Sequence, residues 1–169
     1  MKKNLVLLGM MAVGKTTLGK MVAKNHNLEF VDTDSIIENK NSMTINEIFE
    51  KRGEKFFRIE EKKEVVKSLK KNNCVIALGG GAFINKTIRE NVLKNAISVW
   101  LDIDIRILIE RTKWSQKRPL LNEGKYQKKL SELYMQRKNI YKLADHKIIC
   151  DKLRKRDIVK KITAIYEKY

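Results

Sequence analysis

The sequence predicts an α/β fold, in which a parallel sheet is covered by helices on both faces. Short apolar runs alternate with longer segments of helical periodicity along the 169 residues, which is the pattern of strand–helix–strand units. No internal repeat, low-complexity tract or flexible linker interrupts this alternation. A chain of this length is expected to form one domain with a substantial core, so residues 1–169 are treated as a single unit.

The apolar runs are the candidate strands, and the periodic segments between them are the candidate helices. The strands are expected at Leu5–Leu8, Glu29–Asp32, Val75–Leu78, Ile97–Leu101 and Lys147–Cys150. The helices are expected at Lys15–Asn25, Ser35–Lys40, Ile45–Arg52, Glu54–Lys71, Lys86–Lys94, Ile105–Arg111, Lys125–Leu143 and Arg154–Lys168. Thr44 and Glu47 have the spacing of a capping box, and Gly53 is placed to end the short helix that this box begins.

The least periodic stretch is residues 113–124, which contain Pro119, the only proline of the chain. A loop of about a dozen residues between two helices is long enough to serve a function. We therefore predict a lid at about residues 113–124.

Residues 9–17 carry the clearest functional motif, a G-x-x-x-x-G-K-[ST] phosphate loop directly after the first candidate strand. Its glycines let the backbone bend around phosphate oxygens, and the helix that begins near Gly14 points unpaired N–H groups at the anion. Lys15 can reach the β- and γ-phosphates, and Thr16 can offer its hydroxyl to Mg²⁺. Ala12 stands where many such loops carry another glycine, and it is strained if its φ angle is positive.

The chain is strongly basic, with 37 Lys and Arg against 20 Asp and Glu, a net charge of +17. Nucleic-acid binding must therefore be considered. The densest basic stretches, Lys113–Lys129 and Lys152–Lys161, contain few aromatic residues, so no base-stacking platform is evident. We expect a lysine-rich surface that favours an anionic small ligand, and not a nucleic-acid partner.

A cytoplasmic protein without membrane contact is expected. No apolar run approaches the roughly 18 residues that span a bilayer. The basic N-terminus is followed by the phosphate loop, which cleavage of a signal peptide would destroy. Cys74 and Cys150 lie far apart in apolar runs and are expected to be buried free thiols, consistent with a reducing cytosol.

Polar residues and glycines follow the other candidate strands. Asp32 and Asp34 close the second strand, Gly79–Gly81 close the third, and Asp102 closes the fourth. Ligands of open α/β sheets bind at these carboxyl ends. One aspartate could hold Mg²⁺ through water while another accepts a hydrogen bond from a substrate hydroxyl. Helix capping is the competing interpretation, and spacing alone does not decide between Asp32 and Asp102 as the acid beside the metal.

Four arginines stand out in a chain that uses mostly lysine for its solvated charge: Arg58, Arg111, Arg118 and Arg137. Arginine suits the bidentate binding of carboxylate or phosphate better than lysine does. For any single one of them, a plain surface charge is the competing interpretation.

Together these motifs resemble the shikimate kinase family, a branch of the nucleoside-monophosphate-kinase-like phosphate-loop kinases. The matches run in order over nearly the whole chain: Gly9–Thr16, Asp32–Asp34, Phe57–Glu61, Leu78–Gly81, Arg118–Leu121, and Arg137 with Tyr141. The resemblance implies a three-layer α/β/α arrangement with a five-stranded parallel sheet of order 2-3-1-4-5, a lid, and an acceptor-binding helical region at about residues 33–61. It also implies transfer of the γ-phosphoryl group of ATP to the 3-hydroxyl of shikimate, in the chorismate pathway of aromatic amino acid biosynthesis, with Mg²⁺ as cofactor. We expect a monomer.

The resemblance further implies a role for each matching residue. The catalytic residues would be Lys15, Asp34 and Arg118. ATP would be bound by Gly9, Met11, Ala12, Val13, Gly14, Lys15, Thr16, Thr17, Arg111, Arg118 and Arg154. Shikimate would be bound by Asp34, Arg58, Gly80, Gly81 and Arg137, and the metal by Thr16 and Asp32.

Within these sets, Asp34 would orient and deprotonate the hydroxyl, and Arg58 and Arg137 would clamp the carboxylate of shikimate. Arg118 would swing in on the lid, and Arg111 would pack against adenine. The other face of adenine would meet residues 151–154, where Arg154 is the candidate.

Two alternatives stay open. A related small-molecule kinase, such as a gluconate kinase, would share the loop and the need for a carboxylate clamp. A non-catalytic module would instead bind nucleotides and nucleic acid through the basic surface. Trp114, within the lid, has no assigned role.

Overall fold

A computed structural model of the chain describes residues 3–113 and 123–169. Its sheet has five parallel strands in the order β2-β3-β1-β4-β5. The strands are β1 (Asn4–Leu8), β2 (Glu29–Asp32), β3 (Cys74–Ala77), β4 (Ala96–Asp102) and β5 (His146–Ile149). The predicted fold class and strand order are confirmed, and the strands lie within one residue of their expected ends.

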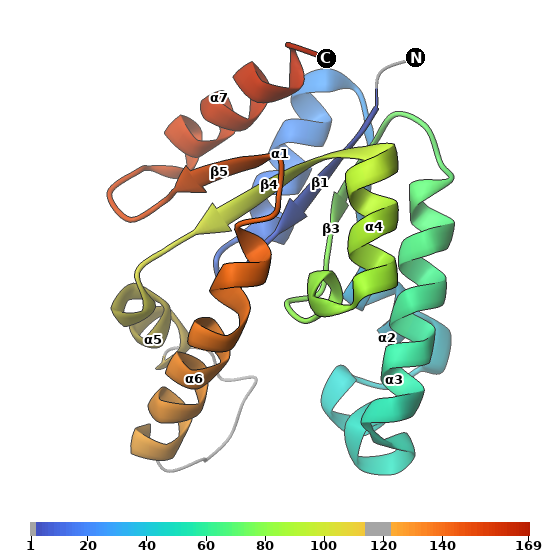
Figure 1. The fold of residues 1–169 in the computed structure, drawn as a ribbon, viewed down its shortest axis with the longest axis vertical. Coiled ribbons are helices and arrows are strands. Elements are labelled where there is room, and N and C mark those ends of the chain that lie inside the picture. Colours follow the sequence, from blue (N-terminus) through green and yellow to red (C-terminus); the bar gives the residue numbers. More distant parts are fainter. Residues whose placement is uncertain (1–2, 114–122) are drawn as a thin grey trace.

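Helices cover both faces of this sheet (Figure 1). They are α1 (Lys15–His26), α2 (Thr33–Asn41), α3 (Ile45–Leu69), α4 (Lys86–Asn95), α5 (Ile105–Lys113), α6 (Glu123–Tyr141) and α7 (Lys155–Tyr166), with a 3₁₀ turn, η1 (Ala82–Ile84). Helices α1 and α7 pack against each other on one face, and α3 and α4 pack together on the other. None of the helices in the described part of the chain is long and apolar enough to cross a membrane.

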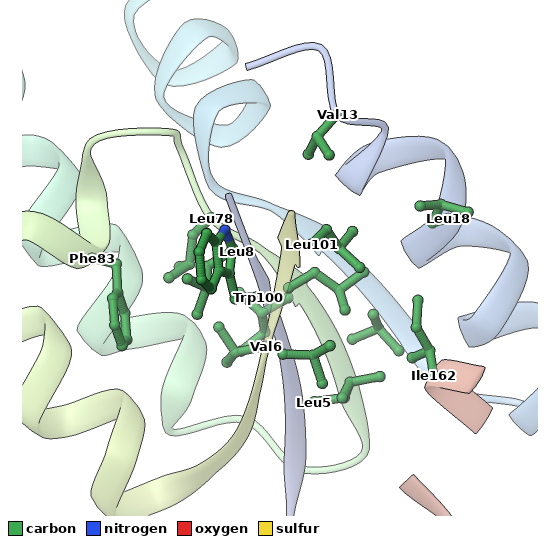
Figure 2. Packing of buried hydrophobic residues seen from close by; sticks show 14 of the residues in the cluster. Leu5, Val6, Leu8, Val13, Leu18, Leu78, Phe83, Trp100, Leu101 and Ile162 are labelled. Carbon is green, nitrogen blue, oxygen red and sulfur yellow. The ribbon is translucent and has the colours of Figure 1, made fainter. Parts of the chain in front are cut away.

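The core lies on both sides of the central strand β1, whose five residues are all buried. In Figure 2, Val6 and Leu8 lie on the side of Phe83, while Leu5 lies on the side of Leu18 and Ile162. Alternate residues of β1 therefore pack against opposite helical layers, which explains why its sequence is a continuous apolar run.

A second, smaller apolar cluster lies apart from this core. Its buried members are Ile37 of α2 and Ile48 and Phe57 of α3, with Phe49 and Phe56 packed around them. These residues hold α2 and the first half of α3 together, within residues 33–61, where the sequence predicts an acceptor-binding region.

The structure confirms the predicted break at Gly53 and differs from the predicted elements mainly at the ends of helices. Gly53, whose φ of 80° and ψ of 163° are not helical, separates the two expected helices, and α3 includes both of them with a bend at this residue. The short turn η1 was not expected, since three residues carry too little periodicity to predict it. Helix α5 ends at Lys113 and α6 begins at Glu123, and residues 114–122 of the predicted lid lie outside the described residues.

Candidate active site

The carboxyl ends of β1, β2 and β3 bring together the phosphate loop, the first turn of α2 and the glycines at residues 79–81. Because all strands are parallel, these ends share one edge of the sheet. Helices α2 and α3 lie on one side of this edge, and α5 and α6 lie on the other (Figure 1). The segments that the sequence singled out therefore meet in one place.

The phosphate loop leads from β1 into α1, with Gly14 as the residue that precedes the helix. The Nζ atom of Lys15 donates hydrogen bonds to the carbonyl oxygens of Gly9 (3.0 Å) and Met10 (2.9 Å). Burial lowers the pKa of Lys15 to about 8, although the nearby Asp34 and Asp32 oppose this shift. The lysine is thus held inside its own loop, beside two acidic groups.

Ala12 has a φ angle of 62°, so it occupies the left-handed region. This conformation is strained for alanine, because its Cβ approaches the neighbouring carbonyl oxygen. The position that the sequence marked as unusual is therefore a strained one.

Asp32 divides its two carboxylate oxygens between two tasks. Its Oδ1 accepts hydrogen bonds from the backbone N–H groups of Asp34 (3.1 Å) and Ser35 (3.3 Å), which caps α2. Its Oδ2 accepts a hydrogen bond of 2.6 Å from the hydroxyl of Thr16 in the phosphate loop. The capping interpretation and a position beside the loop are therefore compatible. The cap also explains why α2 begins at Thr33 and not at Ser35.

Asp102 is engaged elsewhere. Its Oδ1 accepts a hydrogen bond from the hydroxyl of Tyr134 (3.1 Å), and its Oδ2 pairs with Lys147 (2.8 Å). Both oxygens thus have protein partners, and neither partner is Thr16, which bonds to Asp32 instead. This geometry favours Asp32 over Asp102 as the acid near a metal.

Asp34 is placed by its neighbour Thr33. The Thr33 hydroxyl accepts a hydrogen bond from Gly79 N–H (3.1 Å) and donates one to the Ala77 carbonyl (3.2 Å), which joins the start of α2 to the end of β3. The Oδ1 atom of Asp34 is buried and has no hydrogen-bond partner in the described part of the chain. A Cβ atom at Gly79 would clash with this oxygen, so only glycine leaves room for it.

Burial raises the pKa of Asp34 to about 6, and the attraction of Lys15 opposes the rise. A carboxylate with a raised pKa and an unpartnered oxygen is suited to accept a proton or a hydrogen bond from a ligand. Glu61 adds a second buried oxygen, Oε1, that has no hydrogen-bond partner within residues 3–113 and 123–169. Burial also raises the pKa of Glu61, against the opposing charge of Arg58.

Arg58 extends from α3 toward the glycine turn. Its Nη1 pairs with Glu61 (2.8 Å) and its Nη2 with Glu54 (3.1 Å), while the guanidinium lies 5.2 Å from the ring centre of Phe57. A Cβ atom at Gly81 would lie 2.6 Å from Arg58 Nη1, so this turn and the arginine are in close contact.

Arg137 reaches the same turn from α6. Its Nη1 donates to the carbonyl oxygen of Gly80 at 3.2 Å. The hydroxyl of Tyr141, one helical turn further on, donates to the same oxygen. The structure thus brings Arg58, Arg137 and Asp34 together around residues 79–81 from three different helices.

The remaining predicted residues lie further out. The Nη1 atom of Arg111, at the end of α5, lies 3.5 Å from the Val13 carbonyl of the phosphate loop. Arg154 is exposed at the start of α7, where it pairs with Asp157 at 3.0 Å. Arg118 and Trp114 lie outside the described residues.

Two residues of this site received no role from the sequence, although both lie within matched segments. Glu61 stands three positions after Arg58, and Tyr141 stands four positions after Arg137. Such spacings place both members of each pair on one helix face. This spacing is the signal that could have identified them.

Comparison with known proteins agrees with the fold and identifies the family. The family model for shikimate kinase matches residues 11–167. A shikimate kinase from Sulfurihydrogenibium sp. (strain YO3AOP1) is 39% identical over 160 residues, 95% of each chain. One from Thermoanaerobacter pseudethanolicus is 40% identical over 146 residues, 86% of this chain and 85% of that one.

Among solved structures, a shikimate kinase from Acinetobacter baumannii in complex with shikimate is 33% identical, with a TM-score of 0.91 over 99% of this chain and 94% of that one. A gluconokinase from Sinorhizobium meliloti has a TM-score of 0.63 at 13% identity over 99% of this chain and 93% of that one, and this likeness concerns the fold alone. The chain belongs to the shikimate kinase family.

Proposed function

We propose that this protein transfers the γ-phosphoryl group of ATP to the 3-hydroxyl of shikimate, giving shikimate 3-phosphate. The observation that carries the proposal is the arrangement around residues 79–81. This turn, beside the phosphate loop, is surrounded by two arginines, Arg58 and Arg137, and by Asp34, whose buried Oδ1 has no hydrogen-bond partner among the described residues. Such a site suits an acceptor that has both a hydroxyl and a carboxylate.

On the donor side, the phosphates of ATP lie against the backbone of the phosphate loop, residues 9–17. The Nζ atom of Lys15, now bonded to two loop carbonyls, turns to the β- and γ-phosphates. Arg118 adds positive charge from the lid, and Arg111 and Arg154 flank the adenine. Phosphoryl transfer is catalysed mainly by positioning the reactants and by neutralising the negative charge around the transferred group.

Mg²⁺ fits beside Thr16 and Asp32, whose hydroxyl and carboxylate oxygens are hard donors 2.6 Å apart. No cluster of three His, Cys, Asp or Glu side chains that could hold a metal occurs in residues 3–113 and 123–169. Kinase sites, however, bind Mg²⁺ mainly through the substrate phosphates and water, with one or two protein oxygens. The ion, when bound, neutralises phosphate charge.

On the acceptor side, Asp34 accepts a hydrogen bond from the 3-hydroxyl of shikimate. This bond directs a lone pair of the hydroxyl oxygen at the γ-phosphorus. Its pKa of about 6 leaves it ionised at neutral pH and able to take the proton as the new bond forms. Arg58 and Arg137 hold the carboxylate of shikimate, and the backbone of Gly80 and Gly81 lines the site. Fixing both reactants in this way lowers the entropic part of the barrier.

A coupled assay of ADP release tests the proposal, with shikimate, gluconate and a nucleoside monophosphate supplied as acceptors in parallel. We expect release with shikimate only. Arg58→Ala should raise KM for shikimate while ATP binding is unchanged, because Arg58 lies on the acceptor side. Release that is independent of shikimate, or faster with gluconate, would refute the proposal.

The net charge of +17 favours a second candidate, a module that binds nucleic acid. It requires tight RNA or DNA binding near physiological salt, with a steep salt dependence. Binding that disappears at this salt concentration removes the candidate.

We further propose that the enzyme acts as a monomer in the cytoplasm. Cys74 and Cys150 are buried free thiols, which supports a reducing compartment. Light scattering and cell fractionation test the two statements separately.

A further inference from the structure

The carbonyl oxygen of Gly80 accepts hydrogen bonds from two side chains of one helix, α6. Arg137 donates from Nη1 at 3.2 Å, and Tyr141 donates from its hydroxyl. The two residues are four positions apart, so they lie on the same face of the helix. One hydrogen bond is enough to satisfy this half-buried carbonyl oxygen, so the second donor is available for another role.

Tyr141 is held rigidly for this contact. Its side chain is fully buried, and its ring centre lies 5.9 Å from that of Trp100 on β4. The Sδ atom of Met10 lies 3.9 Å from the Tyr141 hydroxyl. A phenol has one proton to donate, and a carbonyl is a stronger acceptor than a thioether, so the proton goes to Gly80. Burial raises the pKa of Tyr141, against the charge of Arg137 and a hydrogen bond between the two side chains, so the hydroxyl stays protonated and also contacts the guanidinium.

Arg137, in contrast, has a second task under the proposed function. A guanidinium that forms a bidentate pair with a carboxylate aims its N–H groups at that carboxylate. A bidentate pair takes two of the five N–H groups of Arg137 and fixes the plane of its guanidinium, which weakens its bond to the Gly80 carbonyl when shikimate binds. If the bound ligand also shields this carbonyl from water, the loss of its hydrogen-bond donor costs free energy.

We propose that Tyr141 is a positioning residue that keeps the Gly80 carbonyl bonded, so that Arg137 is free to bind the carboxylate of the acceptor. This inference rests on the proposed function. Without the hydroxyl, Arg137 is the remaining donor to Gly80 in the described part of the chain, and the carbonyl competes with the acceptor for it. Removal of the hydroxyl therefore weakens the binding of the acceptor and leaves the rate of the chemical step unchanged.

The test is Tyr141→Phe, which removes a single hydroxyl. KM and Kd for shikimate should rise about fivefold to tenfold, the range of one lost hydrogen bond, while kcat and KM for ATP stay within about twofold. The matched control is Tyr134→Phe on the same helix, whose hydroxyl bonds to Asp102 instead. It loses the same atom and should leave shikimate binding unchanged.

A double-mutant cycle separates positioning from a general structural effect. In Arg137→Met, no guanidinium competes for Gly80, so adding Tyr141→Phe should weaken shikimate binding much less than it does in the wild type. Calorimetric titration of shikimate into the four proteins measures this coupling. An equal loss in both backgrounds overturns the inference, and so does an unchanged KM in Tyr141→Phe.

The two proposals fail in different ways. Wild-type protein without shikimate-dependent ADP release contradicts the proposed function itself. Active wild-type protein with unaltered shikimate binding in Tyr141→Phe contradicts only the role of Tyr141. Thermal melts of both phenylalanine variants establish that each is folded before it is compared.

Discussion

At the scale of single residues, Asp34 shows how a functional group is kept at the expense of stability. Its Oδ1 atom is buried without a hydrogen-bond partner in the described residues, and burial raises its pKa to about 6. An unpaired buried carboxylate destabilises a folded protein. Such groups persist at sites where a ligand completes the missing interaction.

Asp34→Asn should therefore abolish turnover and stabilise the protein. The pKa of Asp34 is about 6 in the folded chain and about 3.9 in an unfolded one. The free energy of unfolding is thus highest below about pH 4, where Asp34 is protonated in both states. It falls by up to about 3 kcal/mol as the pH rises through 6 and the folded state has to hold the ionised carboxylate.

Asparagine mimics the protonated form, so the variant should be more stable than the wild type at pH 8, and this advantage should vanish toward pH 4. Urea denaturation at both pH values measures the difference. Glu50→Gln, at an exposed site on α3, is the control and should change neither value. A constant advantage at all pH values would contradict the assignment.

Ala12 provides a second prediction at this scale. Its φ of 62° is unfavourable for alanine and neutral for glycine. Ala12→Gly should therefore raise the free energy of unfolding by about 1 kcal/mol. Chemical denaturation checks this value, and a destabilised variant would show that the backbone is not strained at this position.

At the scale of elements, Asp32 joins the phosphate loop to α2, the helix that carries Asp34. One of its oxygens caps the helix and the other binds Thr16. A change at Asp32 therefore acts on helix stability and on the loop at once. Only a pair of substitutions can separate these effects.

Asp32→Asn keeps an oxygen for the cap but removes the charge, whereas Asp32→Ala removes both. We expect Asp32→Ala to lose about 1 kcal/mol of stability and Asp32→Asn to lose less than half of that. Both should require more Mg²⁺ for half-maximal activity. Thermal melts and Mg²⁺ titrations of the activity measure the two effects, and equal destabilisation in both variants would argue against the cap.

The helices and strands were largely predictable because their apolar runs and caps are local signals. The start of α2 was misjudged by two residues, since its cap is the side chain of Asp32 and not of a residue nearer Ser35. Most site residues could be named from motifs. The roles of Glu61 and Tyr141 could not, because they depend on which backbone group or side chain each one meets across the fold.

At the scale of the whole molecule, the charge and the core have different distributions. The net charge of +17 comes mainly from lysines, a composition that attracts anionic substrates over distance. The apolar residues, in contrast, form one large cluster around the sheet and a small one between α2 and α3. The region of α2 and the first half of α3 is thus stabilised by a smaller apolar cluster than the region around the sheet.

The small cluster around Ile37, Ile48 and Phe57 has a consequence for how the protein opens. It is separate from the core around the sheet, and the bend at Gly53 lies between its members Ile48 and Phe57. We expect amide protons of residues 35–52 to exchange with solvent through a local opening, at a lower free energy than those of β1 and β4. Bound shikimate should slow exchange in this region first, whereas ATP should not. Mass spectrometry of deuterium uptake would show the acceptor end of the molecule as a separate cooperative unit.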